Sequence, residues 1–228
     1  MNDVPPLPWS VSAAHVAEPY REDLRHLPVC SVDPPGCRDI DDALHVRVLK
    51  KDNHHDEHKH KHKHDDDDDD DDDSVVWEVG VHIADVSYFV KPGSFVDAEA
   101  AKRSTTTYLV QRRIDMLPKA LTEEICSLKG NEERLVFSVL WHVRPNGDIL
   151  STRFTKGVIR SRAALTYQEA QARIDESSSS SHKSLDKSLD KSLDKSHTSH
   201  THDDDDDDEV SGSLRRMMTF AKNLRRRR

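Results

Sequence analysis

The sequence has little cysteine and no long apolar run. Its three cysteines, Cys30, Cys37 and Cys126, are odd in number and widely spaced, so neither a disulfide framework nor a cysteine-based zinc site is expected. No apolar run is long enough to span a membrane, and the N-terminus has no apolar signal-peptide core. These absences predict a soluble protein of the nucleus or the cytoplasm, with no membrane partner.

Hydrophobic residues are also scarce, at 34% of the chain, which looks marginal for a packed core. Two low-complexity tracts distort this figure. Residues 51–74 carry six histidines and nine consecutive aspartates, and residues 176–209 carry three copies of Lys-Ser-Leu-Asp and an acidic run. Their net charges are −8 and −7 within a total of −9, which leaves +6 on the remaining residues. The folded part is therefore expected to be basic, as phosphate-binding proteins tend to be.

Both tracts lack the apolar residues that a core needs, and their like charges repel, so we expect two disordered insertions. A regulatory metal-binding role of the histidines is the alternative for residues 51–74. Strands are expected on both sides of that tract, which favours a tolerated insertion at a hairpin tip.

The chain is organised around one acidic stretch, residues 31–44, which read SVDPPGCRDIDDAL. It contains four aspartates within ten residues: Asp33, Asp39, Asp41 and Asp42. Pro34 and Pro35 lack an amide hydrogen and Gly36 permits a positive φ, so the backbone turns sharply after the first aspartate. Carboxylates brought together repel one another unless protons or metal ions compensate them, and oxygen ligands suit Mg²⁺ or Mn²⁺.

Two other interpretations of this stretch compete. A solvated acidic loop is the usual explanation of a short charge cluster, but apolar residues flank it, from Val32 before it to Val46 after it. A calcium loop of the EF-hand type fails, because Leu44 stands where that loop needs glycine and Lys50 where it needs glutamate. The stretch therefore favours a site for a hard divalent cation.

The apolar patterns predict an α+β fold, with a mixed, mostly antiparallel sheet and helices packed around it. Strands are expected at 29–32, 44–50 and 75–90, and as a hairpin at 134–143 and 149–159 around Asn146-Gly147. Helices are expected at 94–103 after an N-cap at Ser94, and at 123–129, 163–174 and 214–224. Residues 1–27 are expected to form a linker that ends in a helical turn at 20–27.

A second candidate site surrounds Tyr108, which is followed by Arg112 and Arg113. An aromatic ring near arginines suits single-stranded nucleic acid, because bases stack on the ring while phosphates pair with guanidinium groups. Composition alone favours a plain strand tyrosine. His82 and Asp85 are weaker candidates, as supports for the metal ligands, and a structural histidine is an equal alternative for His82.

Four motifs in matching order resemble the catalytic domain of the ribonuclease II superfamily, most nearly that of the catalytic subunit of the eukaryotic RNA exosome. They are DPPGCRDIDDAL (33–44), WEVGVHIADVSYFVKPG (77–93), TTTYLVQRRIDMLPKALTEEICSLKG (105–130) and FTKGVIRSRAALTYQEAQARID (154–175). The resemblance implies that residues 28–175, apart from 51–74, form the N-terminal part of an RNB-type catalytic domain. Residues 176–209 are then a low-complexity linker, and residues 210–228 a basic helix with which the domain continues.

The resemblance implies a hydrolytic 3′–5′ exoribonuclease that acts on single-stranded RNA with divalent metal ions and releases nucleoside 5′-monophosphates. It implies that Asp33, Asp39 and Asp42 hold Mg²⁺, or Mn²⁺, directly or through water. Asp41 belongs to the same metal site and is the implied catalytic residue, whose loss should abolish cleavage but spare binding.

For RNA, the resemblance implies that Tyr108 stacks on a base and that Tyr167 packs against the 3′-terminal nucleotide. A core-facing helix tyrosine is the alternative for Tyr167. Arg112 and Arg113 are candidate phosphate contacts, and the RNA exosome core is the implied protein partner.

The sequence also departs from the family. The later part of the family's domain supplies a catalytic arginine and a wall of the RNA channel, and we find neither here. The alternative function is therefore a catalytically incomplete fragment that binds RNA or docks on the exosome, which metal-dependent release of mononucleotides would distinguish from an active enzyme. A third hypothesis, an acidic metal-buffering protein, predicts that deletion of 51–74 abolishes function.

Overall fold

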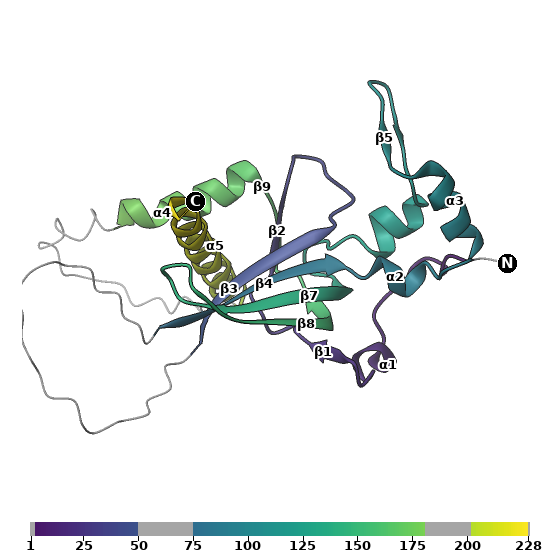
Figure 1. The fold of residues 1–228 in the computed structure, drawn as a ribbon. Coiled ribbons are helices and arrows are strands. Elements are labelled where there is room, and N and C mark those ends of the chain that lie inside the picture. The colour runs from purple at the N-terminus through teal and green to yellow at the C-terminus, as the bar shows by residue number, and fades with distance from the viewer. Residues whose placement is uncertain (1–2, 50–74, 181–201, 228) are drawn as a thin grey trace, which may run out of the picture.

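The computed structural model describes residues 3–49, 75–180 and 202–227 (Figure 1). Its centre is a seven-stranded sheet in the order β1-β8-β7-β4-β3-β2-β9. The strands are β1 Arg21–Asp23, β2 Cys30–Asp33, β3 Asp42–Leu49, β4 Val76–Ala84, β7 Glu133–Val143, β8 Ile149–Arg160 and β9 Ala163–Thr166. The pairings of β1 with β8 and of β9 with β2 are parallel, and the others are antiparallel. The predicted α+β fold is confirmed. Residues 51–74 and 181–201 of the two predicted insertions lie outside the described residues, whereas 176–180 and 202–209 are helical and not disordered as expected, because they extend α4 and α5.

Helices and a small second hairpin complete the fold. The helices are α1 Ala13–Val16, α2 Val86–Phe89, α3 Phe95–Arg103, α4 Tyr167–Ser180 and α5 His202–Arg226, and η1 Ala120–Ile125 is a π-helical turn. The second hairpin pairs β5 Thr107–Tyr108 with β6 Arg113–Ile114 and stands away from the main sheet (Figure 1). No helix in the described ranges has both the length and the apolar character needed to cross a lipid bilayer.

The predicted long hairpin is confirmed as β7 and β8. Gly147 has φ of +102°, a value that glycine adopts without a steric penalty. The amide of Asp148 donates to the side-chain oxygen of Asn146 over 2.9 Å, and the amide of Arg144 donates to the Asp148 carbonyl over 2.8 Å. The turn chemistry read from the sequence therefore sets the register of the two longest strands.

The predicted helix at 94–103 is confirmed as α3. The amide of Asp97 donates to the hydroxyl of Ser94, the N-cap residue, over 3.2 Å. Lys102 and Arg103 lie in the last turn, where positive charge stabilises the carbonyl end of a helix.

Three predicted elements are wrong in type or extent. The helical turn expected at 20–27 is the strand β1, because its backbone pairs with β8 and the amide of Leu24 donates to the Val158 carbonyl over 2.9 Å. The strand expected at 75–90 leaves the sheet at Asp85, whose carboxylate is held by Lys156 at 3.0 Å, and continues as α2. The helix expected at 123–129 begins and ends earlier, as η1, with the amide of Cys126 bonded to the Leu121 carbonyl.

The helix expected at 163–174 is also partly wrong, since its first four residues form the strand β9. Ala163 to Thr166 pair with β2, from Cys30 to Asp33, so tertiary pairing overrides the local pattern. The helix α4 starts at Tyr167 after a reciprocal cap: the amide of Thr166 donates to the Glu169 carboxylate over 2.7 Å, and the Glu169 amide donates to the Thr166 hydroxyl. This capping box holds the start of α4 at the end of β9.

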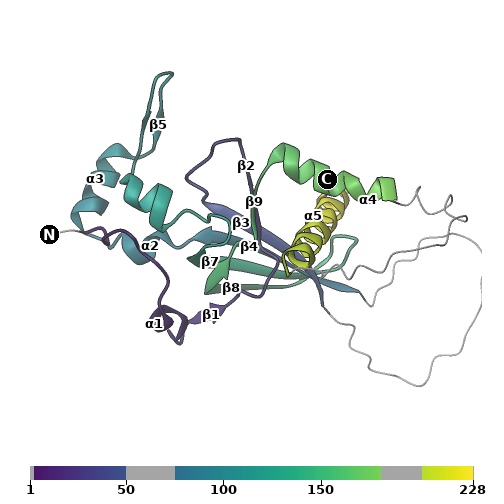
Figure 2. The ribbon, with the colours of Figure 1, turned by 180° about the vertical axis from the view of Figure 1, so that it is seen from behind.

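The final helix is longer than the 214–224 predicted, and it covers one face of the sheet (Figures 1 and 2). Phe220 of α5 packs with Val46, Val79 and Val143 in one buried cluster. The strand β3 pairs with β2 only at Leu44, so the amide of Val46 has no strand partner on that side. The hydroxyl of Ser213 on α5 accepts a hydrogen bond from this amide over 2.7 Å, so the amide has a partner.

Beneath the opposite face of β4, a glycine makes room for a buried histidine. A Cβ atom added to Gly80 would lie 2.2 Å from Cε1 and 2.5 Å from Nδ1 of His45, and 2.9 Å from a methyl carbon of Leu140. His45 is fully buried and bonded to His82 over 2.9 Å, so its ring has no room to withdraw. The close contact therefore requires glycine at this position.

We expect Gly80→Ala to lower the free energy of unfolding by about 1–3 kcal/mol, the usual effect of overpacking a core. Urea denaturation followed by circular dichroism measures this loss. Gly212→Ala is the matched control, because there the added carbon meets only the flexible guanidinium of Arg216 inside α5. It should leave stability unchanged or raise it by up to about 1 kcal/mol. Equal losses in both variants would contradict the steric explanation.

Candidate active site

The acidic loop between β2 and β3 folds as its sequence predicts and is fastened to the core. The amide of Cys37 donates to the Pro34 carbonyl over 3.1 Å, and Gly36 has φ of +79°. Further along, Ile40 is buried, and its amide donates to the hydroxyl of Ser127 over 3.2 Å. The same hydroxyl donates to the Arg38 carbonyl over 2.7 Å. The segment that follows η1 thus fixes the path of the loop.

The four aspartates lie at one end of the central strands. Asp33 is the last residue of β2 and Asp42 is the first residue of β3. The carbonyl of Asp41 accepts the amide of Ala84, at the end of β4, over 2.9 Å. The ends of β2 and β3 and the loop between them therefore bring the four carboxylates to one end of the central strands.

The aspartates act on one another electrostatically. Burial raises the pKa of Asp41, and the charges of Asp39, Asp42 and Asp33 raise it further. Burial also raises the pKa of Asp33, and the charges of Asp42 and Asp39 add to the shift. Within the described part of the chain, Oδ2 of Asp33 is buried without a hydrogen-bond partner. An all-carboxylate donor set with an unpaired buried oxygen fits a hard divalent cation.

The positions of the carboxylates differ from a closed metal site. Across residues 3–49, 75–180 and 202–227, no group of three or more His, Cys, Asp or Glu side chains is arranged to hold a metal ion. Instead, Oδ1 of Asp39 lies 2.7 Å from Nη1 of Arg113. The same guanidinium also pairs with Asp115 and, over 2.8 Å, with Glu123. Arg113, predicted to contact RNA phosphate, is here a partner of the acidic loop.

Tyr108 faces the acidic loop from the hairpin of β5 and β6. A cavity of about 380 Å³ is lined by Asp39, Asp41 and Tyr108 together with apolar residues that include Ile83. The same three residues line a neighbouring hollow with Arg113. Tyr108 is 73% exposed in the short strand β5, so its ring is open to a ligand and is not part of the core.

The backbone of Tyr167 lies beside the end of β2, which carries Asp33. Thr166 pairs with Asp33 in the parallel register of β9 and β2, so Tyr167 follows directly after the partner of the first aspartate. Its side chain is 60% exposed at the start of α4, and a core-facing tyrosine is therefore excluded. The capping box described above supplies the local reason for this position.

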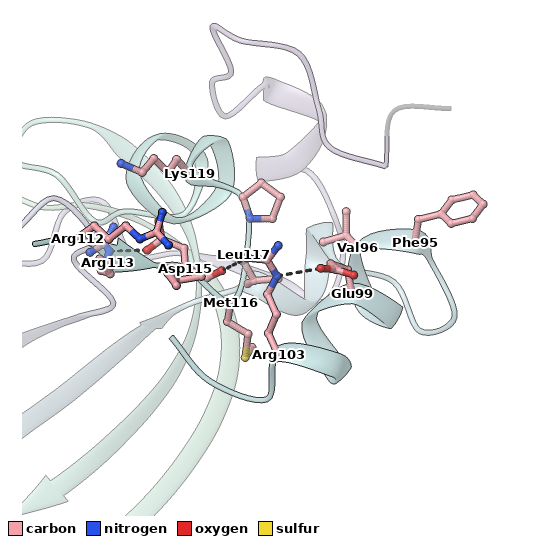
Figure 3. Close-up of a pocket in the computed structure, with 12 residues that line it drawn as sticks. Phe95, Val96, Glu99, Arg103, Arg112, Arg113, Asp115, Met116, Leu117 and Lys119 are labelled. Carbon is pink, nitrogen blue, oxygen red and sulfur yellow. Dashed lines mark hydrogen bonds and ion pairs between the residues drawn. The ribbon is translucent and has the colours of Figure 1, made fainter. Parts of the chain in front are cut away.

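The other candidate residues lie apart from the carboxylates. Arg112 lines a separate pocket with Phe95 and Lys119, next to the pair formed by Arg103 and Glu99 (Figure 3). The carboxylate of Asp85, the N-cap residue of α2, is bonded to Arg21 and Lys156. No motif in the sequence indicated Ser127, Asp115 or Glu123, whose contacts depend on how the acidic loop, β6 and η1 fold together.

His82 belongs to a buried polar network of the sheet. Its Nε2 lies 2.9 Å from Nδ1 of His45, and its Nδ1 lies 2.8 Å from the hydroxyl of Ser138. His45 in turn contacts Glu78, which is bonded to Arg47 over 2.7 Å. Burial, and then the neighbouring His45, lower the pKa of His82 to about 3. These contacts are those of a structural histidine.

Comparison with known proteins gives the family. The chain is 56% identical over 174 residues to the "Exosome complex exonuclease RRP44 homolog A" of Arabidopsis thaliana, which covers 76% of this chain and 16% of that protein. Its fold is similar to that of Mycoplasma genitalium RNase R, solved with double-stranded RNA, with a TM-score of 0.68, 21% identity, and coverage of 96% of this chain and 31% of RNase R. It is also similar to yeast Ssd1, described as a pseudonuclease, with a TM-score of 0.55, 22% identity, and coverage of 76% of this chain and 18% of Ssd1.

The seven-stranded sheet and its acidic loop together form one α+β domain. The model of the RNB domain matches residues 21–228, and the chain belongs to this family. It spans about one sixth of the length of the curated relative. The match begins at β1, in keeping with the pairing of that strand to the sheet.

The buried network predicts an acid-sensitive fold. The unfolded chain protonates His82 near its ordinary pKa of 6.5, whereas the folded chain does so only near a pKa of about 3. The contribution of His82 to the free energy of unfolding is therefore fully present above pH 6.5 and is lost as the pH falls from 6.5 toward 3. Between pH 7 and pH 5 we expect the free energy of unfolding to drop by about 2 kcal/mol.

Urea titrations at several pH values measure this slope. His82→Gln removes the titrating group and should flatten the slope between pH 7 and pH 5, whatever its effect on stability at pH 7. An unchanged slope in this variant would assign the acid sensitivity to other groups.

Proposed function

We propose that this chain carries the aspartate site of a 3′–5′ exoribonuclease that hydrolyses single-stranded RNA with divalent metal ions and releases nucleoside 5′-monophosphates. The observation that carries the proposal is the acidic loop, whose carboxylates interact at one sheet edge and face Tyr108 across a cavity. Membership in the RNB family and the likeness to a protein named an exonuclease support it.

The residues that would hold Mg²⁺ or Mn²⁺ are the four aspartates Asp33, Asp39, Asp41 and Asp42. When bound, the metal supplies an activated water nucleophile and neutralises charge on the phosphate. Asp33 offers its unpaired buried oxygen, and Asp41 lines the cavity where the scissile phosphate would lie. Burial, and then the charges of the neighbouring aspartates, raise the pKa values of these two carboxyls.

The two exposed tyrosines give the RNA its position. Tyr108 offers an open ring beside Asp39 and Asp41, and Tyr167 offers one beside the partner of Asp33. Rings on both sides of the carboxylates would stack on bases and hold the 3′ end against them. Arg112 makes no side-chain hydrogen bond or ion pair among the described residues, so its guanidinium is available for phosphate.

The wider setting is part of the same proposal. The RNA exosome core is the proposed protein partner, because the curated relative carries the exosome in its name, and nucleus or cytoplasm is the proposed location. The relative is much longer than this chain, so these properties concern a larger protein.

A catalytically incomplete fragment is the second candidate function. Two observations favour it. Arg113 forms an ion pair with the carboxylate of Asp39, a proposed metal ligand, and the fold is shared with a protein described as a pseudonuclease. Such a fragment would bind RNA or the exosome through the same tyrosines but would release no mononucleotides.

We expect Asp41→Asn to reduce the rate of RNA shortening at least a hundredfold while RNA affinity stays within about twofold, because one charge is lost with little change of shape. The assay follows 5′-labelled single-stranded RNA with Mg²⁺ or Mn²⁺, and fluorescence anisotropy gives the affinity. Asp148→Asn is the control, since this aspartate lies at the β7–β8 turn and contacts Arg227. Equal losses of rate and affinity would contradict the role of Asp41, and no shortening by the unaltered chain would favour the incomplete fragment.

We expect Tyr108→Ala to weaken RNA binding by about 1–3 kcal/mol, the usual contribution of one stacked base. Tyr108→Phe retains the ring and should bind as the unaltered chain does. Binding is measured by anisotropy in Ca²⁺, so that hydrolysis does not consume the RNA. A loss in the phenylalanine variant equal to that in the alanine variant would assign the contact to the hydroxyl.

A further inference from the structure

Arg113 is the cationic centre of a cluster of three carboxylates. Its guanidinium contacts Asp39 at 2.7 Å and Glu123 at 2.8 Å, and it also pairs with Asp115. The side chain is about one-fifth exposed, so solvent screens these contacts only in part. Among the described residues, Arg113 is the sole cation within ion-pair distance of Asp39.

The three carboxylates belong to separate parts of the fold. Asp39 comes from the acidic loop, Glu123 from η1, and Asp115 from the segment that follows β6. Arg113 itself lies directly opposite Tyr108 in the register of β5 and β6. One guanidinium therefore joins the acidic loop to the hairpin that carries Tyr108.

The ion pairs of Arg113 with Asp115 and Glu123 decide what happens to the guanidinium if its contact with Asp39 breaks. Asp115 and Glu123 would still hold Arg113, and Glu123 also has Lys119 at 3.5 Å. The base of the hairpin, where Arg103 donates to the Asp115 carbonyl over 2.9 Å, would stay in place as well (Figure 3). The contact of Arg113 with Asp39 is thus the part of the cluster that can break alone.

We propose that Arg113 is a positioning residue that substitutes for a divalent cation at Asp39 and gives up this carboxylate when the cation binds. The inference rests on the proposed function, in which Asp39 is a metal ligand. A carboxylate oxygen bonded to a guanidinium at 2.7 Å is not free to turn toward a metal ion. Metal binding would therefore release the acidic loop from the hairpin and alter the position of Tyr108 relative to the aspartates.

The test is a double-mutant cycle on metal affinity, without RNA. Mn²⁺ binding is measured by electron paramagnetic resonance of the free ion, for the unaltered chain, Arg113→Gln, Asp39→Asn and the double variant. Arg112→Gln is the matched control, because it removes the same charge one residue away. The tracts at 51–74 and 176–209 are the same in every protein, so their own binding of Mn²⁺ cancels in the comparison.

We expect Arg113→Gln to tighten Mn²⁺ binding at the aspartates about tenfold, because it removes both a competitor and a nearby positive charge. In the Asp39→Asn background, the same substitution should have no larger effect than Arg112→Gln. An Arg113→Gln affinity equal to or weaker than that of the unaltered chain would overturn the inference. A tenfold gain that persists in the Asp39→Asn background would also overturn it, since the effect would then not pass through Asp39.

This design separates the inference from the proposed function. If Asp33→Asn leaves Mn²⁺ binding unchanged, the metal site itself is wrong and the proposed function fails. If Asp33→Asn weakens binding but Arg113→Gln behaves like Arg112→Gln, only the inference fails. Circular dichroism of each variant shows whether it is folded.

The expected movement has its own readout. Chymotrypsin cleaves after exposed Tyr108 and Leu109, at a rate that depends on how firmly the hairpin is held. Mg²⁺ should speed this cleavage at least threefold in the unaltered chain and should have no effect in Arg113→Gln, where the loop is already released. Equal responses to Mg²⁺ in both proteins would overturn the proposed release.

Discussion

Mutual repulsion among four aspartates at one sheet edge is the constraint on which the rest of this structure depends. Strands β2 and β3 and the loop between them bring these carboxylates together, and burial prevents water from screening them fully. Two neighbouring residues offset the effects of this negative charge. Ser127 fixes the loop that would otherwise open, and Arg113 supplies a positive charge from the hairpin. The unpaired oxygen of Asp33 marks the charge that remains.

The residues that stabilise the domain differ from those proposed to carry out its chemistry. Apolar packing under α5 and the buried network of His45, His82 and Glu78 stabilise the interior of the sheet. The exposed rings of Tyr108 and Tyr167 and the four aspartates contribute little to the core. This separation is why we expect a buried glycine or histidine to govern unfolding, and an aspartate or tyrosine to govern RNA chemistry.

Local signals predicted the elements that depend on local chemistry. The Asn146-Gly147 hairpin, the Ser94 cap and the proline-glycine turn after Asp33 all require particular residue types at particular steps, and all three formed as expected. The errors concern segments whose state is decided by distant partners: β1 pairs with β8, and β9 pairs with β2. The contact of Arg113 with Asp39 was not predicted for the same reason, because sequence alone does not place its guanidinium beside that carboxylate.

The parallel pairing of β2 with β9 also has a consequence for how the site comes into being. Asp33 and Thr166 are neighbours in space but lie near opposite ends of the folded segment. Closing so long a loop is entropically expensive, and contacts of this kind form late in folding. During synthesis on the ribosome, the acidic loop therefore exists before Tyr167 has emerged. The nascent chain would thus form the acidic loop before Tyr167 can lie beside it.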